Sequence, residues 1–304
     1  MKILLIGKNG QVGHELTRWL QRIDGMQMQV VALDRSQLDL ANLAQVREVI
    51  GQIRPSVIVN AAAYTAVDLA EQESEMAMRI NGEAVGVIAR EARRCGAALV
   101  HYSTDHVFDG VKSSPYVETD ATSPVNAYGR SKLAGEEAIR ASGVAHLILR
   151  TSWVYGTRGK NFLLTIQRLA GERNELAIVA DQVGAPTWSR TVAQQTAQVL
   201  TQLCRRSQGS VAEAPVIDID TWQKFGGMYH LTAQGHTTWH GLASAIVRSG
   251  PRAHDVRVKP IASDDYAAPA RRPRNARLSC QRFVQCFGAL PTWNEALAAC
   301  LQEA

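Results

Sequence analysis

The sequence predicts an α/β protein built on a doubly wound parallel sheet, followed by a smaller and less regular region. Two observations predict this fold. Short apolar runs that fit buried strands alternate about five times with segments that have helical spacing, the pattern of a parallel sheet covered on both faces. The first apolar run is followed directly by Gly7, Gly10 and Gly13 and then by a helix, the order of a nucleotide-binding turn.

The first half of the chain supplies these elements in order. Lys2–Ile6 fits a strand, and apolar residues spaced from Val12 to Leu20 fit a helix after the glycine turn. The next helix ends before Pro55, because proline disfavours helical geometry in the residue that precedes it. Further strands are expected at 30–33, 57–59, 98–103 and 147–150, and further helices at 43–53, 77–93 and 131–140.

The alternation loosens after Trp153. Helices are expected at 162–169 and 192–203, and the polar stretch 204–227 shows no sustained period, which indicates a long surface loop. We therefore expect a sheet domain over 1–153 and a smaller region over 154–304, of which about 186–204 packs back on the first domain.

Length and composition exclude several classes of protein. The 304 residues fit one or two domains of about 100–200 residues each. With 46% hydrophobic and 20% charged residues the chain is not a disordered one. Its apolar runs fall short of the roughly 18 residues that a membrane span needs, and the first is too short for a secretion signal. Five cysteines without a Cys-x-x-Cys pair suggest neither a disulfide framework nor a zinc site, so we expect a reducing cytoplasm.

The net charge of +5 has two interpretations. Basic patches supply the nonspecific part of affinity for nucleic acid, but here the charges form no stripe along the sequence, and we expect no nucleic-acid partner. The densest group consists of Arg271, Arg272, Arg274 and Arg277. Such a group suits a dianionic small ligand equally well, because guanidinium matches phosphate oxygens, whereas an ordinary solvated surface would also explain it.

The glycine turn predicts a dinucleotide site. Gly7, Gly10 and Gly13 have G-x-x-G-x-x-G spacing, which lets the backbone approach a pyrophosphate at the start of the next helix; a purely structural turn is the alternative. Asp34 follows the second strand, where a carboxylate binds the ribose hydroxyls of NAD or merely caps a loop. Arg35 beside it would suit the 2′-phosphate of NADP, so both NADH and NADPH stay open.

Tyr128 and Lys132 predict acid–base chemistry. Four residues apart on a helix, they share one face, and an ammonium beside a phenol favours the phenolate and lowers its pKa. A solvated helix face would give the same pair. Ser103-Thr104-Asp105 favours the catalytic interpretation, because it follows the 98–102 strand at the carboxyl end of the sheet, where such folds bind ligands.

The glycine turn, Ser103-Thr104-Asp105 and Tyr128-x-x-x-Lys132, in this order, resemble the extended short-chain dehydrogenase/reductases, whose sheet is of the Rossmann type. The resemblance extends to the dTDP-4-dehydrorhamnose reductases over nearly the whole chain, and only the loop 205–226 is longer than usual. The similar stretches lie at 7–13, 60–68, 101–105, 150–155, 181–187 and 237–240.

This resemblance implies reduction of the C4 ketone of dTDP-6-deoxy-L-lyxo-4-hexulose to dTDP-L-rhamnose by NADH or NADPH, the last step toward a sugar used in lipopolysaccharide O-antigen. Tyr128 would donate the proton, Lys132 would also bind the nicotinamide ribose, and Thr104 and Asp105 would hold the sugar. Trp153 would pack against the deoxysugar, with core packing as the alternative. The cofactor residues would be Gly7, Gly10, Gln11, Val12, Gly13, Asp34, Arg35, Asp39, Leu40, Ala62, Ala63, Tyr64, Thr65, Tyr128 and Lys132.

The chain departs from the family pattern in places. His106 stands where members commonly have tyrosine, a change that leaves the chemistry alone. Some members form a dimer bridged by Mg²⁺ through carboxylates, two of whose positions are taken here by Arg190 and Asn294. Glu15 remains, and Glu295 would replace Asn294 after a shift of one residue, but a hard cation needs several oxygen ligands. The sequence therefore argues against a metal and leaves a homodimer open.

Two other functions stay open at this stage. A sister reductase would act on another 4-keto nucleotide sugar or give another epimer. A regulatory subunit would keep the nucleotide pocket without catalysis, which the presence of Thr104, Tyr128 and Lys132 together argues against.

Overall fold

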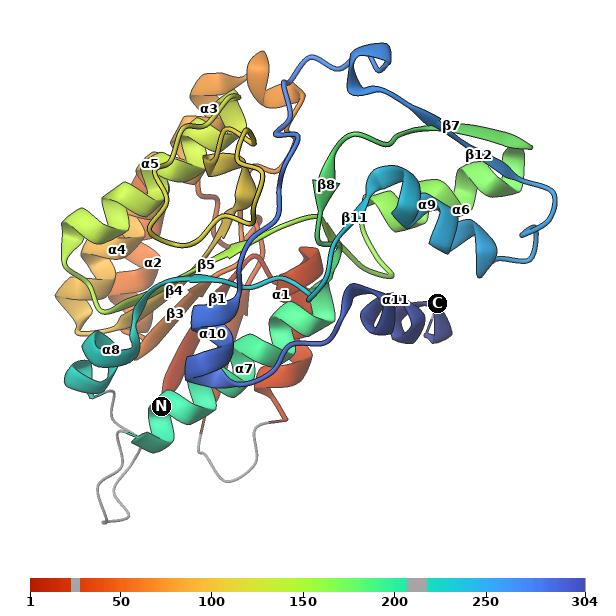
Figure 1. Ribbon diagram of the computed structural model, residues 1–304. Helices are drawn as coiled ribbons and strands as arrows, with labels where there is room; N and C mark the ends of the chain where they lie inside the picture. Colours follow the sequence, from red (N-terminus) through yellow and green to blue (C-terminus); the bar gives the residue numbers. More distant parts are fainter. Residues whose placement is uncertain (23–27, 207–217, 304) are drawn as a thin grey trace.

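The computed structural model describes residues 1–22, 28–206 and 218–303, and its centre is a six-stranded sheet in the order β10-β5-β4-β3-β1-β2 (Figure 1). All five strand pairs are parallel, which confirms the predicted doubly wound sheet. The order reverses between β1 and β3, and ligands of such sheets bind outside the carboxyl ends of the strands at this reversal. The strands are β1 Lys2–Ile6, β2 Gln29–Leu33, β3 Val57–Asn60, β4 Ala98–Thr104, β5 His146–Thr151 and β10 Gly227–His230.

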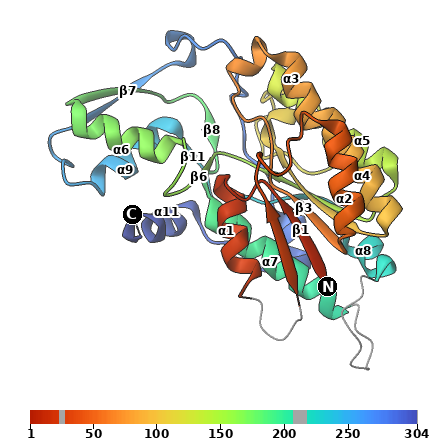
Figure 2. The same cartoon turned by 180° about the vertical axis from the view of Figure 1, so that it is seen from behind.

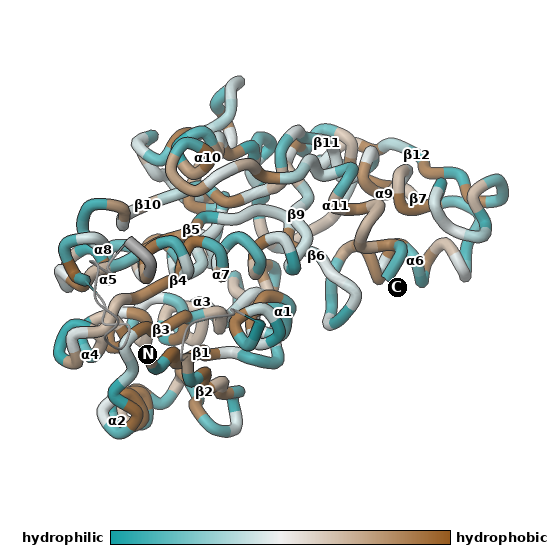
Figure 3. The backbone as a smooth tube through the Cα atoms, turned by 90° about the horizontal axis from the view of Figure 1, so that it is seen from below, coloured by the Kyte–Doolittle hydropathy of each residue, from teal (hydrophilic) through white to brown (hydrophobic). Residues whose placement is uncertain are grey.

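Helices cover both faces of this sheet, as Figures 1 and 2 show from opposite sides. Successive strand side chains point to opposite faces, so Ile3 and Leu5 of β1 join one core cluster while Leu4 and Ile6 join the other. Because both faces are buried, the strands are apolar throughout, and the hydrophobic colour follows β1 and β3 in Figure 3. One face carries α1 Gln11–Leu20, α7 Ser189–Arg206, α8 Ile219–Phe225 and α10 Gln281–Phe287, and the other carries α2 Leu43–Ile53, α4 Ala84–Cys95 and α5 Ala127–Ser142.

The helix expected over 77–93 begins earlier and changes its winding. α3 Ser74–Met78 continues through a π-helical turn, Arg79–Glu83, into α4. Asn81 in this turn donates to Ser131 Oγ and to the carbonyl of Tyr64, both at 3.0 Å, and accepts from the amide of Tyr64 at 2.9 Å. The π turn therefore fixes the segment after β3 against α5, an arrangement typical of functional sites.

The second half of the chain also builds a smaller body beside the sheet, at the right of Figure 1. Its core cluster includes Leu163, Leu176, Leu242 and Leu297. It contains α6 Phe162–Glu172, α9 Trp239–Arg248 and α11 Trp293–Gln302, and three strand pairs: β6 Val154–Tyr155 with β9 Thr187–Trp188, β7 Glu175–Val179 with β12 Arg257–Ile261, and β8 Val183–Gly184 with β11 Thr237–Thr238. Short 3₁₀ turns lie at η1 Leu69–Glu71, η3 Asp105–Val107 and η4 Ser263–Asp265.

The expectation of a surface loop over 204–227 is wrong wherever the structure describes that stretch beyond α7. Asp218 caps the short helix α8 by accepting from the amides of Asp220 and Thr221. Trp222 is fully buried in the sheet's core cluster. A helix of seven residues is too short to show a sustained period, so the sequence does not reveal it. The remaining part of the expected loop, 207–217, lies outside the described residues.

The segment after α8 also bears on the division of the chain. β10 pairs with β5 in parallel and so adds a strand from beyond residue 153 to the sheet. α7 packs against α1, where Val192 and Leu200 share a cluster with Leu16 and Leu20. The two-domain division at residue 153 stays a prediction. Among the described helices none is both long and apolar enough to span a membrane.

Candidate active site

A cleft of about 880 Å³ opens at the carboxyl ends of β1, β3, β4 and β5 and extends to the smaller body. Apart from Gly13, the residues predicted to bind cofactor or substrate all line it. They are Gly7, Gly10, Gln11, Val12, Asp34, Arg35, Asp39, Leu40, Ala62, Ala63, Tyr64, Thr65, Thr104, Asp105, Tyr128, Lys132 and Trp153. The fold thus brings together residues that lie up to about 150 positions apart in the sequence.

The glycine turn forms one end of the cleft. Gly7 has a φ of +89°, and a Cβ there would lie 2.8 Å from the backbone nitrogen of Ala62, so this position requires glycine. Gly10 immediately precedes α1, whose first amides are free of intrahelical partners and favour an anion. Gly13 instead packs α1 against the turn, since its Cβ would lie 2.1 Å from the carbonyl oxygen of Gly7. Gly13 therefore has a packing role in this turn, and its predicted contact with the cofactor stays a prediction.

Asp34 both lines the cleft and holds its own loop. Its Oδ1 accepts from the amide and the hydroxyl of Ser36 at 3.0 and 2.6 Å. Lys8 lies 3.3 Å from Oδ2. The hydrogen bond from Ser36 and then the Lys8 ammonium lower the pKa of Asp34, which keeps the carboxylate charged. Arg35 is exposed and pairs with Asp39 at 3.6 Å, so two carboxylates and two cations meet at this end of the cleft.

Tyr128 and Lys132 project from the first turns of α5. Asn126 begins this helix by accepting from the amide of Gly129 at 2.7 Å. Lys132 is only 2% exposed, and its Nζ donates to the carbonyl of Tyr102 at 2.6 Å. The helix therefore carries a half-buried phenol and a buried amine to the same wall of the cleft.

The predicted lowering of the Tyr128 pKa is wrong in this structure. Burial raises the pKa of Tyr128 to about 12, and the charge of Asp105 adds to the rise while the Thr104 hydroxyl opposes it. Burial lowers the pKa of Lys132 to about 8, against the influence of Glu136. Desolvation thus dominates the pKa of Tyr128, and the attraction to the Lys132 ammonium that the spacing suggested is not among the groups that shift it.

The carboxyl ends of β4 and β5 form the floor of the cleft. Thr104 Oγ1 donates to Asp105 Oδ1 at 3.0 Å. Burial raises the pKa of Asp105 above its usual range. The hydroxyls of Ser103 and Thr151 are buried and have no hydrogen-bond partner among the described residues. Buried polar atoms are nearly always satisfied, so these hydroxyls indicate a polar ligand on this floor.

Two tryptophans form a flat wall where the sheet meets the smaller body. The rings of Trp153 and Trp239 stack at 3.6 Å with an angle of 9° between their planes. Trp153 has a φ of +48°, and a Cβ on Gly184 would lie 2.5 Å from its ring, so the local backbone is shaped around it. Trp239 donates from Nε1 to Gln182 at 3.1 Å. Sequence reasoning gave Trp239 no role, although it lies in the family-like stretch 237–240.

Of the four clustered arginines, Arg272 lines the cleft. Its guanidinium lies 2.7 Å from Asp68, whose pKa it lowers through a hydrogen bond. Arg274 pairs with Asp264 at 3.5 Å. Arg277 donates to the carbonyl of Ser113 at 2.5 Å. The structure thus gives Arg272, Arg274 and Arg277 separate partners, although the sequence presented them as one group.

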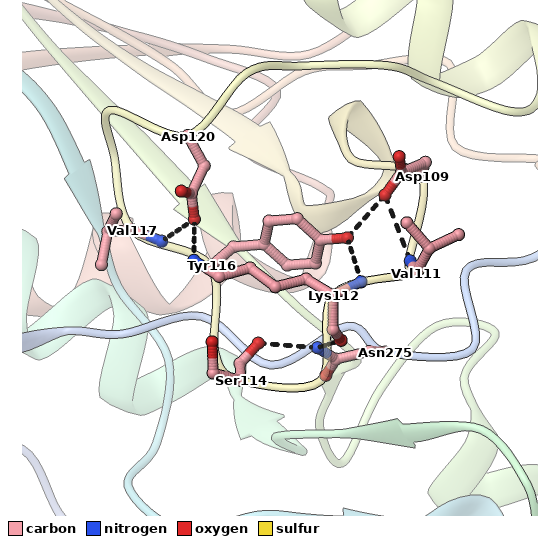
Figure 4. Close-up of polar contacts among 8 residues, drawn as sticks. All are labelled: Asp109, Val111, Lys112, Ser114, Tyr116, Val117, Asp120 and Asn275. Atoms are coloured by element: carbon pink, nitrogen blue, oxygen red, sulfur yellow. Dashed lines mark hydrogen bonds and ion pairs between the residues drawn. The ribbon is translucent and has the colours of Figure 1, made fainter.

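A loop after Thr104 holds the segment that carries Arg272 (Figure 4). Asn275 donates to the carbonyls of Lys112 and Ser114 at 2.6 and 2.9 Å. The loop is itself braced, because Tyr116 donates to Asp109 at 2.6 Å and Lys112 donates to Asp120 at 2.5 Å. The position of Arg272 therefore depends on contacts between residues far apart in the sequence.

Other lining residues were not predicted. Thr151 ends β5 and Ser152 follows it, and their place at the carboxyl edge of the sheet was the signal available for them. His106 also lines the cleft. Its Nδ1 lies 2.9 Å from Asn126 Nδ2, and its ring meets the ring of Tyr128 edge-on with 5.4 Å between the ring centres. Asn9 lies within the predicted glycine turn but was given no role of its own, and Lys160 had no distinguishing pattern in the sequence. The cleft thus contains more polar groups than the motifs alone suggested.

The residues at the positions where some family members bridge a dimer through Mg²⁺ have other partners in this structure. Arg190 donates from Nε to Glu15 at 3.1 Å and also pairs with Glu303, so a guanidinium stands beside the buried carboxylate. Glu295 accepts from the amide of Thr292 in a capping box at the start of α11. Across the described parts of the chain no three His, Cys, Asp or Glu side chains gather where they could hold a metal ion.

Comparisons with known proteins give one consistent family. The model of the RmlD substrate binding domain matches residues 1–304. The dTDP-4-dehydrorhamnose reductase of Burkholderia thailandensis is 48% identical over 100% of this chain and 99% of its own length. That of Escherichia coli K12 is 41% identical, with 100% and 98% covered.

Solved structures agree with the sequence relatives. A dTDP-4-dehydrorhamnose reductase of Clostridium acetobutylicum is 33% identical with a TM-score of 0.86, and one of Bacillus anthracis in complex with NADP is 32% identical with a TM-score of 0.86. Each comparison covers 100% of this chain and 99% of the other. A UDP-glucose 4-epimerase of Thermus thermophilus, at 16% identity and a TM-score of 0.76, shares the fold alone.

Proposed function

The chain belongs to the dTDP-4-dehydrorhamnose reductase family, and on this premise we infer that it reduces the C4 ketone of dTDP-6-deoxy-L-lyxo-4-hexulose to dTDP-L-rhamnose. The observation that carries the inference is a single cleft that combines the glycine turn with Thr104, Tyr128 and Lys132, in a chain related to these reductases over its full length. The enzyme uses NADH or NADPH, which supplies the hydride when bound.

The glycine-turn end of the cleft suits a dinucleotide. The amides at the start of α1 would hold the pyrophosphate, and Gly7 gives the backbone the close approach that this contact requires. Asp34 stays ionised and can accept from ribose hydroxyls, whereas Lys8 and Arg35 beside it can pair with a 2′-phosphate. The relative from Bacillus anthracis contains NADP, and both forms of the cofactor fit the groups present here.

Tyr128 acts as the proton donor. With a pKa of about 12 the phenol is protonated at neutral pH and has a proton to give. As hydride adds to C4, the ketone oxygen gains charge, and the O–H of Tyr128 transfers its proton to that oxygen, leaving an alcohol and a phenolate. Thr104 hydrogen-bonds the same oxygen, and the bond strengthens as charge develops, which lowers the barrier. The Lys132 ammonium stabilises the phenolate.

The smaller body and its connecting segments hold the sugar nucleotide. Trp153 and Trp239 offer a flat apolar wall to the deoxysugar, and Asp105 accepts from its hydroxyls. Arg272 offers a guanidinium to the diphosphate. We accordingly assign the cofactor mainly to the region 1–153. The substrate lies between the two regions, with Trp239 and Arg272 contributed by 154–304 and Thr104, Asp105, Tyr128 and Trp153 by 1–153.

The test is turnover of the 4-keto sugar nucleotide by the purified protein with NADH and NADPH in parallel, with the product identified by NMR. We expect NAD(P)H oxidation and dTDP-L-rhamnose. Another C4 epimer would identify a sister reductase, and cofactor binding without turnover would identify a regulatory protein; either result would overturn the assignment.

A further inference from the structure

Three buried polar side chains form a row behind the cleft, from the sheet to α5. Asn60 ends β3, and His101 is its register partner in the middle of β4. Asn60 Nδ2 lies 3.2 Å from His101 Nδ1, and His101 Nε2 lies 3.2 Å from Lys132 Nζ. Asn60 and His101 are each 1% exposed and Lys132 is 2% exposed. The two residues behind Lys132 lie outside the lining of the cleft, and they contact that lining through Lys132 and, at Asn60, through the backbone amide of Ala62.

The backbone fixes which way the Asn60 amide points. Asn60 Oδ1 accepts from the amide of Ala62 at 3.2 Å. Turning the side-chain amide over would set its NH₂ group against that backbone N–H, leaving two donors face to face. The NH₂ group therefore faces His101 and donates to Nδ1.

This contact determines the tautomer of His101. Burial lowers the pKa of His101 well below its usual range, with a further contribution from Lys132, so the imidazole is neutral and carries one proton. Because Nδ1 accepts from Asn60, that proton lies on Nε2. The N–H at Nε2 is directed at Lys132.

Lys132 meets this N–H best as a neutral amine. An ammonium has three N–H groups and no lone pair, so it would oppose a donor to a donor at 3.2 Å. An amine accepts from His101 with its lone pair and still donates to the carbonyl of Tyr102. Burial acts in the same direction and lowers the pKa of Lys132 to about 8.

The charged groups around Lys132 do not reverse this preference. On α5 the neighbours are Tyr128, which is protonated at neutral pH, and Glu136. Glu136 favours the ammonium, but both its oxygens accept from Arg150 of β5, at 2.8 and 2.7 Å, which neutralises much of its field. β4 presents His101 and the Tyr102 carbonyl, and β3 presents Asn60.

We propose that Asn60 and His101 are positioning residues that set the protonation state of Lys132, and through it the pH above which the reaction slows. The proposal rests on the proposed function, in which the ammonium stabilises the Tyr128 phenolate. The ammonium is lost as the pH rises through the pKa of Lys132, so activity falls on the alkaline side. Because Asn60 and His101 favour the neutral amine of Lys132, they move this alkaline loss of activity to lower pH.

Asn60→Asp tests the tautomer argument. A carboxylate still accepts from the amide of Ala62, but it also accepts from Nδ1–H, which frees Nε2 to accept from an ammonium. The pKa of Lys132 should rise by about one unit, because its charged form gains a hydrogen bond and the added carboxylate attracts it. The neutral variant described next separates these two causes. His101→Gln is the second variant, since its side-chain oxygen reaches the place of Nε2. Val100→Ala is the control: it truncates the preceding residue of β4, whose side chain packs on the other face of the sheet.

The direct readout is NMR of the protein without cofactor or substrate. The NMR signal of the Lys132 ε-carbon is assigned as the one that disappears in Lys132→Arg, and its chemical shift is followed against pH. The midpoint of this titration should lie at higher pH in Asn60→Asp and His101→Gln and should be unchanged in Val100→Ala. With ¹⁵N-histidine, the unprotonated nitrogen of His101 should be Nδ1 in the unmodified protein at pH 9. An unprotonated Nε2 there, or an unmoved midpoint in both folded variants, would overturn the proposal.

The pH dependence of kcat gives the second readout. Its alkaline limb should move to higher pH in Asn60→Asp and His101→Gln, by the same shift as the Lys132 midpoint, and stay in place in Val100→Ala. The midpoint is measured without turnover, so a protein that shows the predicted titration but no reductase activity would refute the proposed function alone. A limb that stays in place while the midpoint moves would refute the link to catalysis.

Discussion

The two ends of the cleft are built by different means. At the cofactor end, strand ends and the glycine turn set the geometry, and backbone groups such as the amides after Gly10 provide the contacts. At the substrate end, Trp153 and Arg272 lie on irregular segments and Trp239 begins α9, and side-chain contacts across long sequence separations hold all three. Regular structure positions the shared chemistry, and long-range contacts position the groups that meet the sugar nucleotide.

The largest expected effect lies between the two ends, at Tyr128. Tyr128→Phe removes the proton donor but keeps the ring, so kcat should fall by about 10²–10⁴-fold, the usual contribution of a general acid. The affinity for NAD(P)H, measured by fluorescence titration, should change little. A variant with undiminished kcat would eliminate Tyr128 as the acid.

The cofactor end should fail when its backbone is disturbed. Gly7→Ala places a Cβ at a φ of +89° and 2.8 Å from the backbone of Ala62. A left-handed conformation alone costs a non-glycine residue about 1–2 kcal/mol, and the close contact adds to this, so the free energy of unfolding should fall by more than that amount. Most of the cofactor binding should be lost as well. Gly96→Ala is the matched control, at a φ of +67° with no described atom within 4 Å of its Cβ. Thermal unfolding and cofactor titration of both variants decide the point; equal losses would contradict the close-packed turn.

The substrate end should fail through single side chains. Arg272→Gln removes a charged hydrogen-bond donor, worth about 1.5–3 kcal/mol, so KM for the sugar nucleotide should rise roughly 10- to 100-fold with little change in cofactor affinity. Arg274→Gln, whose side chain is exposed and pairs with Asp264, serves as the control. Equal KM values in the two variants would show that Arg272 has no special part in binding the diphosphate.

The smallest effect is expected at Trp239. Trp239→Leu keeps an apolar side chain but removes the stack on Trp153, worth about 0.5–1.5 kcal/mol, so KM should rise about three- to tenfold. Steady-state kinetics at saturating cofactor measure this change. A large fall in kcat with constant KM would instead give Trp239 a part in the chemical step.

The same contrast explains what the sequence could predict. The strands at β1 to β5, the glycine turn and the Tyr128–Lys132 pair follow from local periodicity and spacing, and the structure gathers them in one cleft. The direction of the Tyr128 pKa shift depends on burial by the rest of the chain, which spacing does not reveal. The pairing of Trp239 with Trp153 and the separation of Arg272 from Arg274 depend on contacts formed only in the folded chain.

The most direct test follows the hydride itself. NADPH or NADH deuterated in turn on each face of the nicotinamide C4 is supplied to the protein with the dTDP-4-keto sugar, and the product is examined by NMR and mass spectrometry. The account predicts dTDP-L-rhamnose with deuterium at C4 of the sugar from one of the two labelled forms. Product without deuterium at C4 from either form, or no product at all, would contradict it.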